Sequence, residues 1–367
     1  MIRLPVPEDS PPPRRRSPFR RRGCLVVLAV LALAGGVSWW IIDRRDRPEQ
    51  APPPVEPDKF SKVEEERALM GTTFRAVVYA LDEDAARTAI AEAFARAEEI
   101  ADICTDYDPE SELSQLSSAP VDRSIKVSPT LATVLAHAVS VAEATGGYFD
   151  PTMGPLTRLW RRTRDTKTLP TGDELTAALA RTGWKHLEVD QLNNTVRLTK
   201  EGMALDLGGI AKGYAADEML AVLQRGGFPS ALIVAGGDVR VGTPPPGRSS
   251  WRVGLRTLGG SAVDYIQVSN CAVSTSGDLH QFVDIEGTRY SHILDPTTGL
   301  GLTRRVAATV VAPEGVMSDP FATFACVVPD VAFNHLNAGT ISLRLVVEVE
   351  GHRKDQQTLN FPEIRVD

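Results

Sequence analysis

Apolar residues recur at helical spacing along several stretches of the chain. Between Ala85 and Cys104, for example, Ile90, Phe94 and Ile100 fall on one face of a helix. The same periodicity, with the glycines and prolines that bound it, predicts four further helices: Pro129–Thr145, Gly172–Arg181, a helix that follows Gly209 and ends at Gly226, and Pro320–Val328.

Two of these helices carry a start signal. Ser128 and Asp319 each precede a proline. Serine and aspartate are favoured at the N-cap, and proline is tolerated in the first helical turn. We therefore expect both helices to begin at those prolines, with Asp319 as the N-cap of the second. The glycine pair at Gly146–Gly147 then ends the first.

Short runs rich in β-branched residues alternate irregularly with the helices. They predict strands at Phe74–Ala80, Thr195–Thr199, Ala231–Ala235, Arg252–Arg256, Ile266–Ser269, Val306–Val311 and Ile341–Val347. Because strands outnumber helices and do not alternate strictly with them, the pattern favours an α+β fold with mixed or largely antiparallel sheets packed with helices. A doubly wound α/β fold is disfavoured. The charged stretch Glu350–Gln357 is interpreted as a surface loop.

An uncharged, mostly apolar run at residues 23–42 is long enough to cross a bilayer once. More arginines precede it than follow it, which predicts a cytoplasmic N-terminus and an extracytoplasmic body. The prediction divides the chain into a basic cytoplasmic leader (1–22), a transmembrane anchor (23–42), a proline-rich linker (43–67) and a folded domain (68–367). The alternative is a cleaved signal peptide, which also places the body outside the cytoplasm.

The net charge and the cysteine spacing argue against two kinds of function, nucleic-acid binding and metal binding by cysteines. The chain carries a net charge of −7 although its N-terminal region is basic, so the body is acidic and no nucleic-acid partner is expected. The cysteines have no CxxC or metal-ligand spacing. Cys104 and Cys326 lie in apolar helical patterns and are predicted core residues, and a disulfide among Cys104, Cys271 and Cys326 stays open.

The stretch Leu205–Asp217 places Asp206, Gly209 and Lys212 at a turn that leads into a helix. The first turn of a helix has unpaired backbone N–H groups and the positive end of the helix dipole, which suit a phosphate. The alternative is a plain strand, turn and helix. A Walker A loop is excluded because no Lys-Ser/Thr pair follows the glycines, and neither G-x-G-x-x-G nor G-x-S-x-G nor HExxH occurs.

Three other segments carry candidate chemistry. Asp319 and Thr323 are four residues apart, so that their oxygens could face a hard cation such as Mg²⁺, unless they are an N-cap and a buried threonine. His292 is a candidate general base because imidazole titrates near neutral pH, or else a structural histidine. Phe149 and Asp150 could flank a heterocycle, or Asp150 could bond its own turn backbone.

Taken together, the order of the motifs resembles one family. The series MGTTF, YDPESELS, GGYFDPTMGPLTRLW, LDLGGIAKGYAAD, VAGGDVRVG, STSGD, YSHILDPTTG and SDPFATFA is similar to the ApbE family of FAD:protein FMN transferases over about residues 68–330. The resemblance implies an Mg²⁺-dependent enzyme that transfers FMN from FAD to a Ser or Thr hydroxyl of a target protein and releases AMP.

The resemblance also implies roles for individual residues. FAD would contact Met70, Tyr107, Tyr148, Phe149, Asp150, Asp206, Lys212 and Leu294. Mg²⁺ would be held by the Gly209 carbonyl, Asp319 and Thr323, and His292 would be the base that activates the acceptor hydroxyl. Gly301 stands where the family often has proline, and Pro320 replaces the usual alanine after the metal aspartate.

Partners and location follow from the same resemblance. The expected acceptor is a membrane redox subunit with a Ser/Thr flavinylation site, and the expected location is the bacterial inner membrane, with one span and a periplasmic catalytic domain. The usual lipobox cysteine is lacking, so the predicted anchor would replace a lipid. Two alternatives stay open: an FAD pyrophosphatase that gives free FMN and AMP, and a non-catalytic FAD-binding protein.

Overall fold

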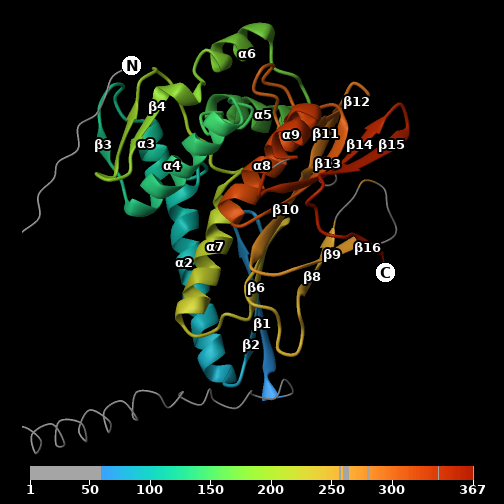
Figure 1. Cartoon of the computed structure of the whole chain (residues 1–367). Coiled ribbons are helices and arrows are strands. Elements are labelled where there is room, and N and C mark those ends of the chain that lie inside the picture. The colour runs from blue at the N-terminus through green and yellow to red at the C-terminus, as the bar shows by residue number, and fades with distance from the viewer. Residues whose placement is uncertain (1–58, 256–257, 259–263, 279–280, 338, 367) are drawn as a thin grey trace, which may run out of the picture. The chain divides into compact units, whose positions relative to one another are not determined.

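The largest element of the structure is an eight-stranded sheet in the order β1-β2-β6-β7-β10-β13-β14-β15 (Figure 1). All of its neighbouring strands are antiparallel. The strands are β1 (Ser61–Leu69), β2 (Thr72–Ala80), β6 (Ala231–Ala235), β7 (Asp238–Val241), β10 (Cys271–Gly277), β13 (Arg305–Ala312), β14 (Ser342–Val349) and β15 (His352–Gln357). The computed structural model describes residues 59–255, 258, 264–278, 281–337 and 339–366.

Helices and smaller sheets surround this sheet. The helices are α2 (Glu83–Cys104), α3 (Glu112–Ser117), α4 (Pro129–Ala144), α5 (Gly154–Thr166), α6 (Gly172–Leu179), η2 (Trp184–His186), α7 (Ala211–Arg225), α8 (Gly315–Val327) and α9 (Pro329–Leu336). The smaller sheets are β3-β5-β4 (Ile125–Lys126, Thr195–Leu198, Leu187–Asp190), β16-β9-β8 (Arg365–Val366, Asp264–Val268, Trp251–Leu255) and β11-β12 (Phe282–Ile285, Thr288–Ser291).

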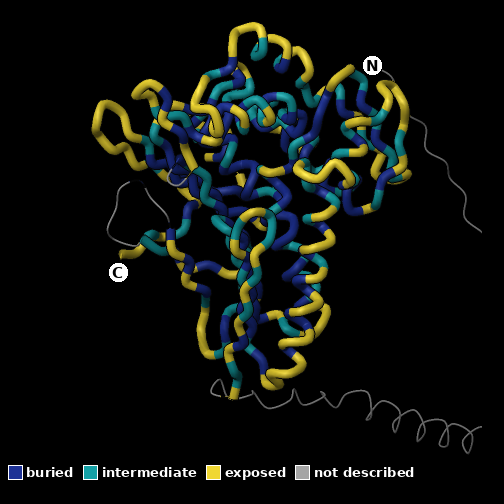
Figure 2. The backbone as a smooth tube through the Cα atoms, turned by 180° about the vertical axis from the view of Figure 1, so that it is seen from behind, coloured by how far each residue is buried: buried dark blue, intermediate teal, exposed yellow. Residues whose placement is uncertain are grey.

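The two faces of the large sheet bury different clusters. On one face, Phe74 of β2 joins Ile90 and Phe94 of α2 in the main core, and all three are fully buried. On the other face, Val273 of β10 packs in a separate cluster with Trp251 of β8. Figure 2 shows the corresponding buried backbone inside exposed loops and helix faces. The site described below lies on the α7 and α8 side of the sheet.

The predicted fold class is confirmed as α+β with antiparallel sheets packed with helices. The predicted helices at Ala85–Cys104 and Pro129–Thr145 are confirmed as α2 and α4, and the Ser128 hydroxyl accepts a hydrogen bond from the Leu131 N–H at 3.1 Å, as an N-cap does. The predicted anchor at 23–42 lies outside the described residues. Within the described ranges, no helix has the length and apolar character needed to span a bilayer.

Two segments that we expected to be irregular form strands. The predicted linker 43–67 ends too late, because Ser61–Leu69 is the edge strand β1 and pairs with β2 across a tight turn with positive φ at Met70 (50°) and Gly71 (70°). The expected loop Glu350–Gln357 likewise contains β15, paired with β14. Both strands are largely polar edge strands, so they lack the β-branched, half-buried pattern that signals a strand.

The predicted start of the helix at Pro320 is wrong. Helix α8 begins at Gly315, so Asp319 lies inside the helix and does not cap it. The cap comes from another helix: the Asp217 carboxylate of α7 accepts hydrogen bonds from the N–H groups of Gly315 and Val316, each at 2.8 Å. A carboxylate supplied from α7 thus meets the positive end of α8.

The close packing of α7 on α8 requires glycine. A methyl group at Gly213 would lie 2.1 Å from the carbonyl oxygen of Gly315, well inside van der Waals contact. One glycine of the LDLGGIAKGYAAD motif therefore serves helix packing and not phosphate approach.

The cysteines of the described part are free thiols. Cys104 and Cys326 are buried, as predicted, and burial raises the pKa of each thiol to about 12. The disulfide that the sequence left open is not formed among Cys104, Cys271 and Cys326.

Candidate functional site

The site lies where two turns of the large sheet and the end of β10 meet the start of α7. The β1–β2 turn carries Met70, and the β6–β7 turn carries Gly236, whose N–H donates to the Thr73 carbonyl at 3.0 Å. A methyl group at Gly237 would lie 3.2 Å from the Thr275 carbonyl of β10. These contacts bring Met70 and the ends of β7 and β10 to one end of the sheet.

Lys212 is the second residue of α7 and is held between two carboxylates. Its Nζ donates to Asp319 Oδ2 at 3.0 Å and lies 3.4 Å from Asp238 Oδ2. It also donates to the Gly208 carbonyl at 3.2 Å. Burial acts against the charge on Lys212, but Asp319 and Asp238 outweigh it and raise the pKa above its ordinary value. Lys212 is therefore a firmly protonated cation.

Asp238, at the start of β7, was not identified as a site residue from the sequence. It is buried, and in the part of the chain that the structure describes its Oδ2 accepts no hydrogen bond. Burial and the neighbouring charge of Asp319 raise its pKa to about 7. The available signal was an acid directly after the glycine pair of VAGGDVRVG, at the end of an apolar strand.

The three residues expected to hold a metal converge. Asp319 and Thr323 are one turn apart on α8, and a methyl group at Gly209 would lie 3.7 Å from Thr323 Oγ1. The Thr323 hydroxyl is also 3.4 Å from the hydroxyl of Ser276 at the end of β10. No cluster of three His, Cys, Asp or Glu side chains that could bind a metal occurs in the described residues. A mixed set of carboxylate, hydroxyl and main-chain oxygens nevertheless suits Mg²⁺, which keeps several waters.

A second group of predicted residues surrounds Arg161 of α5. The guanidinium lies 3.8 Å from the ring centroid of Tyr107 and pairs with Asp106 at 2.8 Å. Asp206 accepts a hydrogen bond from the Gly208 N–H at 2.8 Å, and burial followed by the charge of Asp106 raises its pKa. Arg161 was missed because nothing in the sequence distinguishes it from the other arginines of α5. Tyr107 is 74% exposed and is open to a planar ligand.

The segment that follows α4 contributes an aromatic wall and a structural acid. Phe149 is buried, 3.3 Å from where a methyl group at Gly209 would lie, and Tyr148 packs on Phe324 of α8 with ring centroids 6.2 Å apart. Asp150 accepts hydrogen bonds from the backbone N–H groups of Thr152 at 2.8 Å and Trp184 at 3.0 Å. This arrangement supports the turn-stabilising interpretation of Asp150.

His292 lies at the surface just after β12. Its Nδ1 is 3.1 Å from the Gln281 carbonyl oxygen, which requires Nδ1 to be protonated and leaves Nε2 free to accept a proton. Neighbouring protein atoms remove water from the ring, and together with the charge of Lys212 they lower its pKa. The lowered pKa favours the neutral, basic form. Leu294 is buried in an apolar cluster with Leu156 and Trp160.

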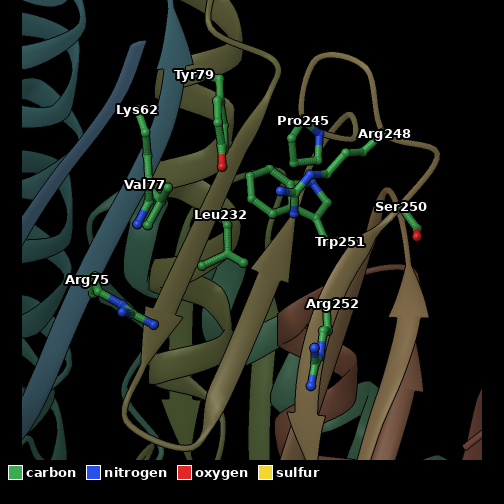
Figure 3. Close-up of a pocket in the computed structure, with 10 residues that line it drawn as sticks. All are labelled: Lys62, Arg75, Val77, Tyr79, Leu232, Pro245, Arg248, Ser250, Trp251 and Arg252. Carbon is green, nitrogen blue, oxygen red and sulfur yellow. The ribbon is translucent and has the colours of Figure 1, made fainter. Parts of the chain in front are cut away.

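Two of the hollows on the described surface differ in their relation to the site. One, of about 190 Å³, lies on the sheet face that carries β8, and Figure 3 shows Arg75 and Tyr79 of β2 and Trp251 of β8 around it. It contains none of the residues predicted from the sequence. The other, of about 490 Å³, is lined by residues of β11 and of the end of α5 and includes Gln281, the partner of His292. The second hollow therefore adjoins the site.

Comparison with known proteins finds similar sequences and similar folds. The sequence model described as the ApbE family matches residues 70–341. FAD:protein FMN transferase of Vibrio cholerae is 30% identical over 271 residues, which covers 72% of this chain and 80% of that protein, and the protein of the same name from Treponema pallidum is 34% identical over 59% of this chain and 63% of its own length. The crystal structure of the ApbE protein from Thermotoga maritima superposes with a TM-score of 0.74 at 30% identity, covering 82% of this chain and 98% of that one.

Proposed function

Because the chain belongs to the ApbE family, we propose that it is an Mg²⁺-dependent enzyme that transfers FMN from FAD to a Ser or Thr hydroxyl of a target protein. One observation carries the proposal: Lys212 at the start of α7 is held between Asp319 and Asp238, within electrostatic reach of the neutral His292. The arrangement combines a cation for phosphate oxygens with a base for a hydroxyl.

In the proposed reaction, the acceptor hydroxyl oxygen attacks the phosphorus of the FMN half of FAD. The bond between that phosphorus and the bridging oxygen breaks, AMP leaves with the bridging oxygen, and the hydroxyl proton passes to Nε2 of His292. Lys212 and the positive end of the α7 dipole stabilise the charge that develops on the phosphate oxygens.

The metal fits the oxygen set of Gly209, Asp319 and Thr323. When bound, Mg²⁺ supplies neutralisation of negative charge on the pyrophosphate. Asp319 in this structure accepts from Lys212, and the second carboxylate, Asp238, lies beside the same amine. Asp238 is thus placed to retain Lys212 when Asp319 turns to a cation.

The remaining groups provide binding surfaces for FAD. Tyr107 offers an exposed ring backed by Arg161, and Phe149 forms a buried apolar wall beside Gly209. Met70 lies on the β1–β2 turn, at the end of the sheet that carries Asp238. These features suit planar rings at either end of a dinucleotide.

The proposal extends to partner and location. The acceptor is a membrane redox subunit, and the catalytic domain is extracytoplasmic, held at the bacterial inner membrane by the run at residues 23–42. Protease added to intact spheroplasts should then digest the domain from outside. Protection until the membrane is lysed would contradict this location.

The activity is tested with FAD, Mg²⁺ and membrane proteins from the same source. Mass spectrometry should detect AMP together with a peptide that carries FMN on Ser or Thr. Asp319→Ala should abolish both products and reduce FAD binding less. AMP with free FMN and no flavinylated peptide would indicate a pyrophosphatase, and tight FAD binding without AMP would indicate a binding protein. Unchanged AMP release by Asp319→Ala would contradict the metal site.

A further inference from the structure

The open hollow next to His292, here called the β11 groove, is lined by Arg164, Lys167, Gln281, Phe282, Val283 and Asp284 and has a volume of about 490 Å³. One wall is the end of α5, where Arg164 is in the last turn and Lys167 is the C-cap. The other wall is four consecutive residues that end in β11. A wall of consecutive residues is the edge of a strand and not the face of a sheet.

The edge of β11 is available for another strand. Within the described residues, β11 pairs with β12 alone. The turn between them has positive φ at Glu286 (50°) and Gly287 (79°), as in a two-residue type I′ hairpin. In such a hairpin the pair next to the turn, Ile285 and Thr288, is hydrogen-bonded, so the next pair directs its backbone groups outward. The N–H and C=O of Asp284 therefore point away from β12.

The walls of the β11 groove are positively charged on balance. In the described ranges, neither Arg164 nor Lys167 has an ion-pair partner, and Asp284 is the one acid that lines the groove. The chain as a whole is acidic. An exposed aromatic side chain, Phe282, adds apolar surface under the guanidinium of Arg289, which is 3.3 Å from the ring centroid. The groove thus complements an extended segment with acidic side chains.

The groove leads directly to the proposed base. Gln281, the residue that precedes β11, accepts hydrogen bonds at 3.1 Å through its backbone carbonyl from both the backbone N–H and the ring of His292. The charge of Arg164 also contributes to the lowered pKa of His292, so the α5 wall is within electrostatic reach of the base. A segment that lies along β11 therefore brings its own side chains to His292.

We propose that the acceptor protein binds as an added strand along β11, with acidic side chains facing Arg164 and Lys167 and its Ser or Thr at His292. This inference rests on the proposed transferase function and names the chemistry of its protein substrate. Main-chain hydrogen bonds to the edge of β11 would supply register, and the two cations would supply selection for acidic sequences.

The selection is tested with a library of ten-residue peptides that have threonine fixed at the centre, incubated with the full chain, FAD and Mg²⁺. Peptides that gain FMN are sequenced by mass spectrometry. The wild-type protein should enrich Asp and Glu near the threonine, and the double variant Arg164→Glu/Lys167→Glu should enrich Lys and Arg and modify the acidic peptides at least tenfold more slowly. FAD binding should be retained.

Arg225→Glu is the matched control, because Arg225 is also an exposed cation in the last turn of a helix, α7, but lies outside the groove. Its peptide preference should equal that of the wild type. If Arg225→Glu and the double variant slow transfer equally, Arg164 and Lys167 merely stabilise a helix end, and the proposal is overturned.

The added strand is tested by Asp284→Pro, which removes the outward N–H while sparing the hairpin bonds, with Asp284→Asn as its partner variant. Asp284→Pro should reduce peptide modification at least tenfold with the melting temperature within a few degrees of wild type, and Asp284→Asn should not reduce it. Equal activity of the two variants overturns strand addition. Transfer to intact proteins but to no peptide also overturns it, whereas loss of all AMP release contradicts the transferase function itself.

Discussion

At the start of α7, charged side chains are packed against one another, whereas the β11–β12 hairpin presents its polar groups to solvent. Asp238 and Asp319 are 6% and 4% exposed, and the single cation between them is Lys212. His292 and Phe282, by contrast, are exposed. The difference predicts that changes in the buried ion cluster affect stability and turnover together, whereas changes in exposed groups of the hairpin affect turnover with little effect on folding.

The largest expected effect is that of Lys212→Met, which tests whether the buried ion cluster supports both stability and turnover. The substitution leaves Asp238 and Asp319 facing each other without their cation, and breaking a buried ion pair costs about 3–5 kcal/mol. Urea unfolding at pH 8 should show a loss of that order, together with loss of AMP release. Lys212→Met/Asp238→Asn should recover part of the stability but not the activity. A stable Lys212→Met protein would contradict the cluster.

His292→Ala tests the opposite region. Loss of a general base reduces turnover by roughly 10²–10⁴-fold, and because His292 is exposed, the unfolding free energy should stay nearly unchanged. The pKa of His292 is lowered, so transfer by the wild type should fall only as the pH drops below about 6.5, the ordinary value. The variant should lack this acidic limb. Unfolding of His292→Ala at room temperature would indicate a structural histidine instead.

Asp217→Asn tests whether the carboxylate of Asp217 stabilises the start of α8. The asparagine oxygen retains one cap but loses the charge that faces Gly315, Val316 and Arg240, and loss of a helix cap costs about 0.5–2 kcal/mol. Thermal unfolding should shift to lower temperature by a few degrees. Glu314→Gln is the control, since the side chain of Glu314 makes no cap hydrogen bond although it occupies the N-cap position. An equal shift in the control would remove the role of Asp217.

Asp238→Asn is expected to change the pH dependence of stability. The pKa of Asp238 in the folded state is about 7, above the ordinary value of 3.8. The folded protein therefore binds more protons than the unfolded chain between these values, so its contribution to stability is greatest at low pH and is lost as the pH rises towards 7. Asp238→Asn should flatten unfolding free energies measured from pH 5 to 8. If the unfolding free energy of Asp238→Asn keeps the same slope against pH, a group other than Asp238 titrates in this range.

Local signals predicted much of the fold because they act through neighbours in the chain. The spacing of Ile90 and Phe94 defined α2, and Ser128 defined the start of α4. The edge strands β1 and β15 escaped prediction because a polar edge strand is recognised by its partner across the sheet and not by its own composition. The start of α8 escaped because its capping acid, Asp217, is about a hundred residues away in the chain.

The candidate site likewise contains residues that the sequence predicted and residues that only the fold reveals. The motif residues Lys212, Asp319 and His292 were predicted from the sequence, through their resemblance to a family and their chemistry. Asp238 and Arg161 were not, since each matters through a charge or a ring that the fold brings to it: Lys212 for the first, Tyr107 for the second.

The sequence by itself determined the main helices and the family, and it supplied the candidate reactive groups. Local periodicity and short motifs are properties of neighbouring residues, and they survive without knowledge of the fold. Tertiary structure alone decided that Asp217 caps α8, that Asp238 shares Lys212, that Asp150 accepts a hydrogen bond from the Trp184 N–H and that β11 leaves an edge beside His292. These contacts join segments distant in the chain, and their energies depend on burial and distance, which no local pattern specifies.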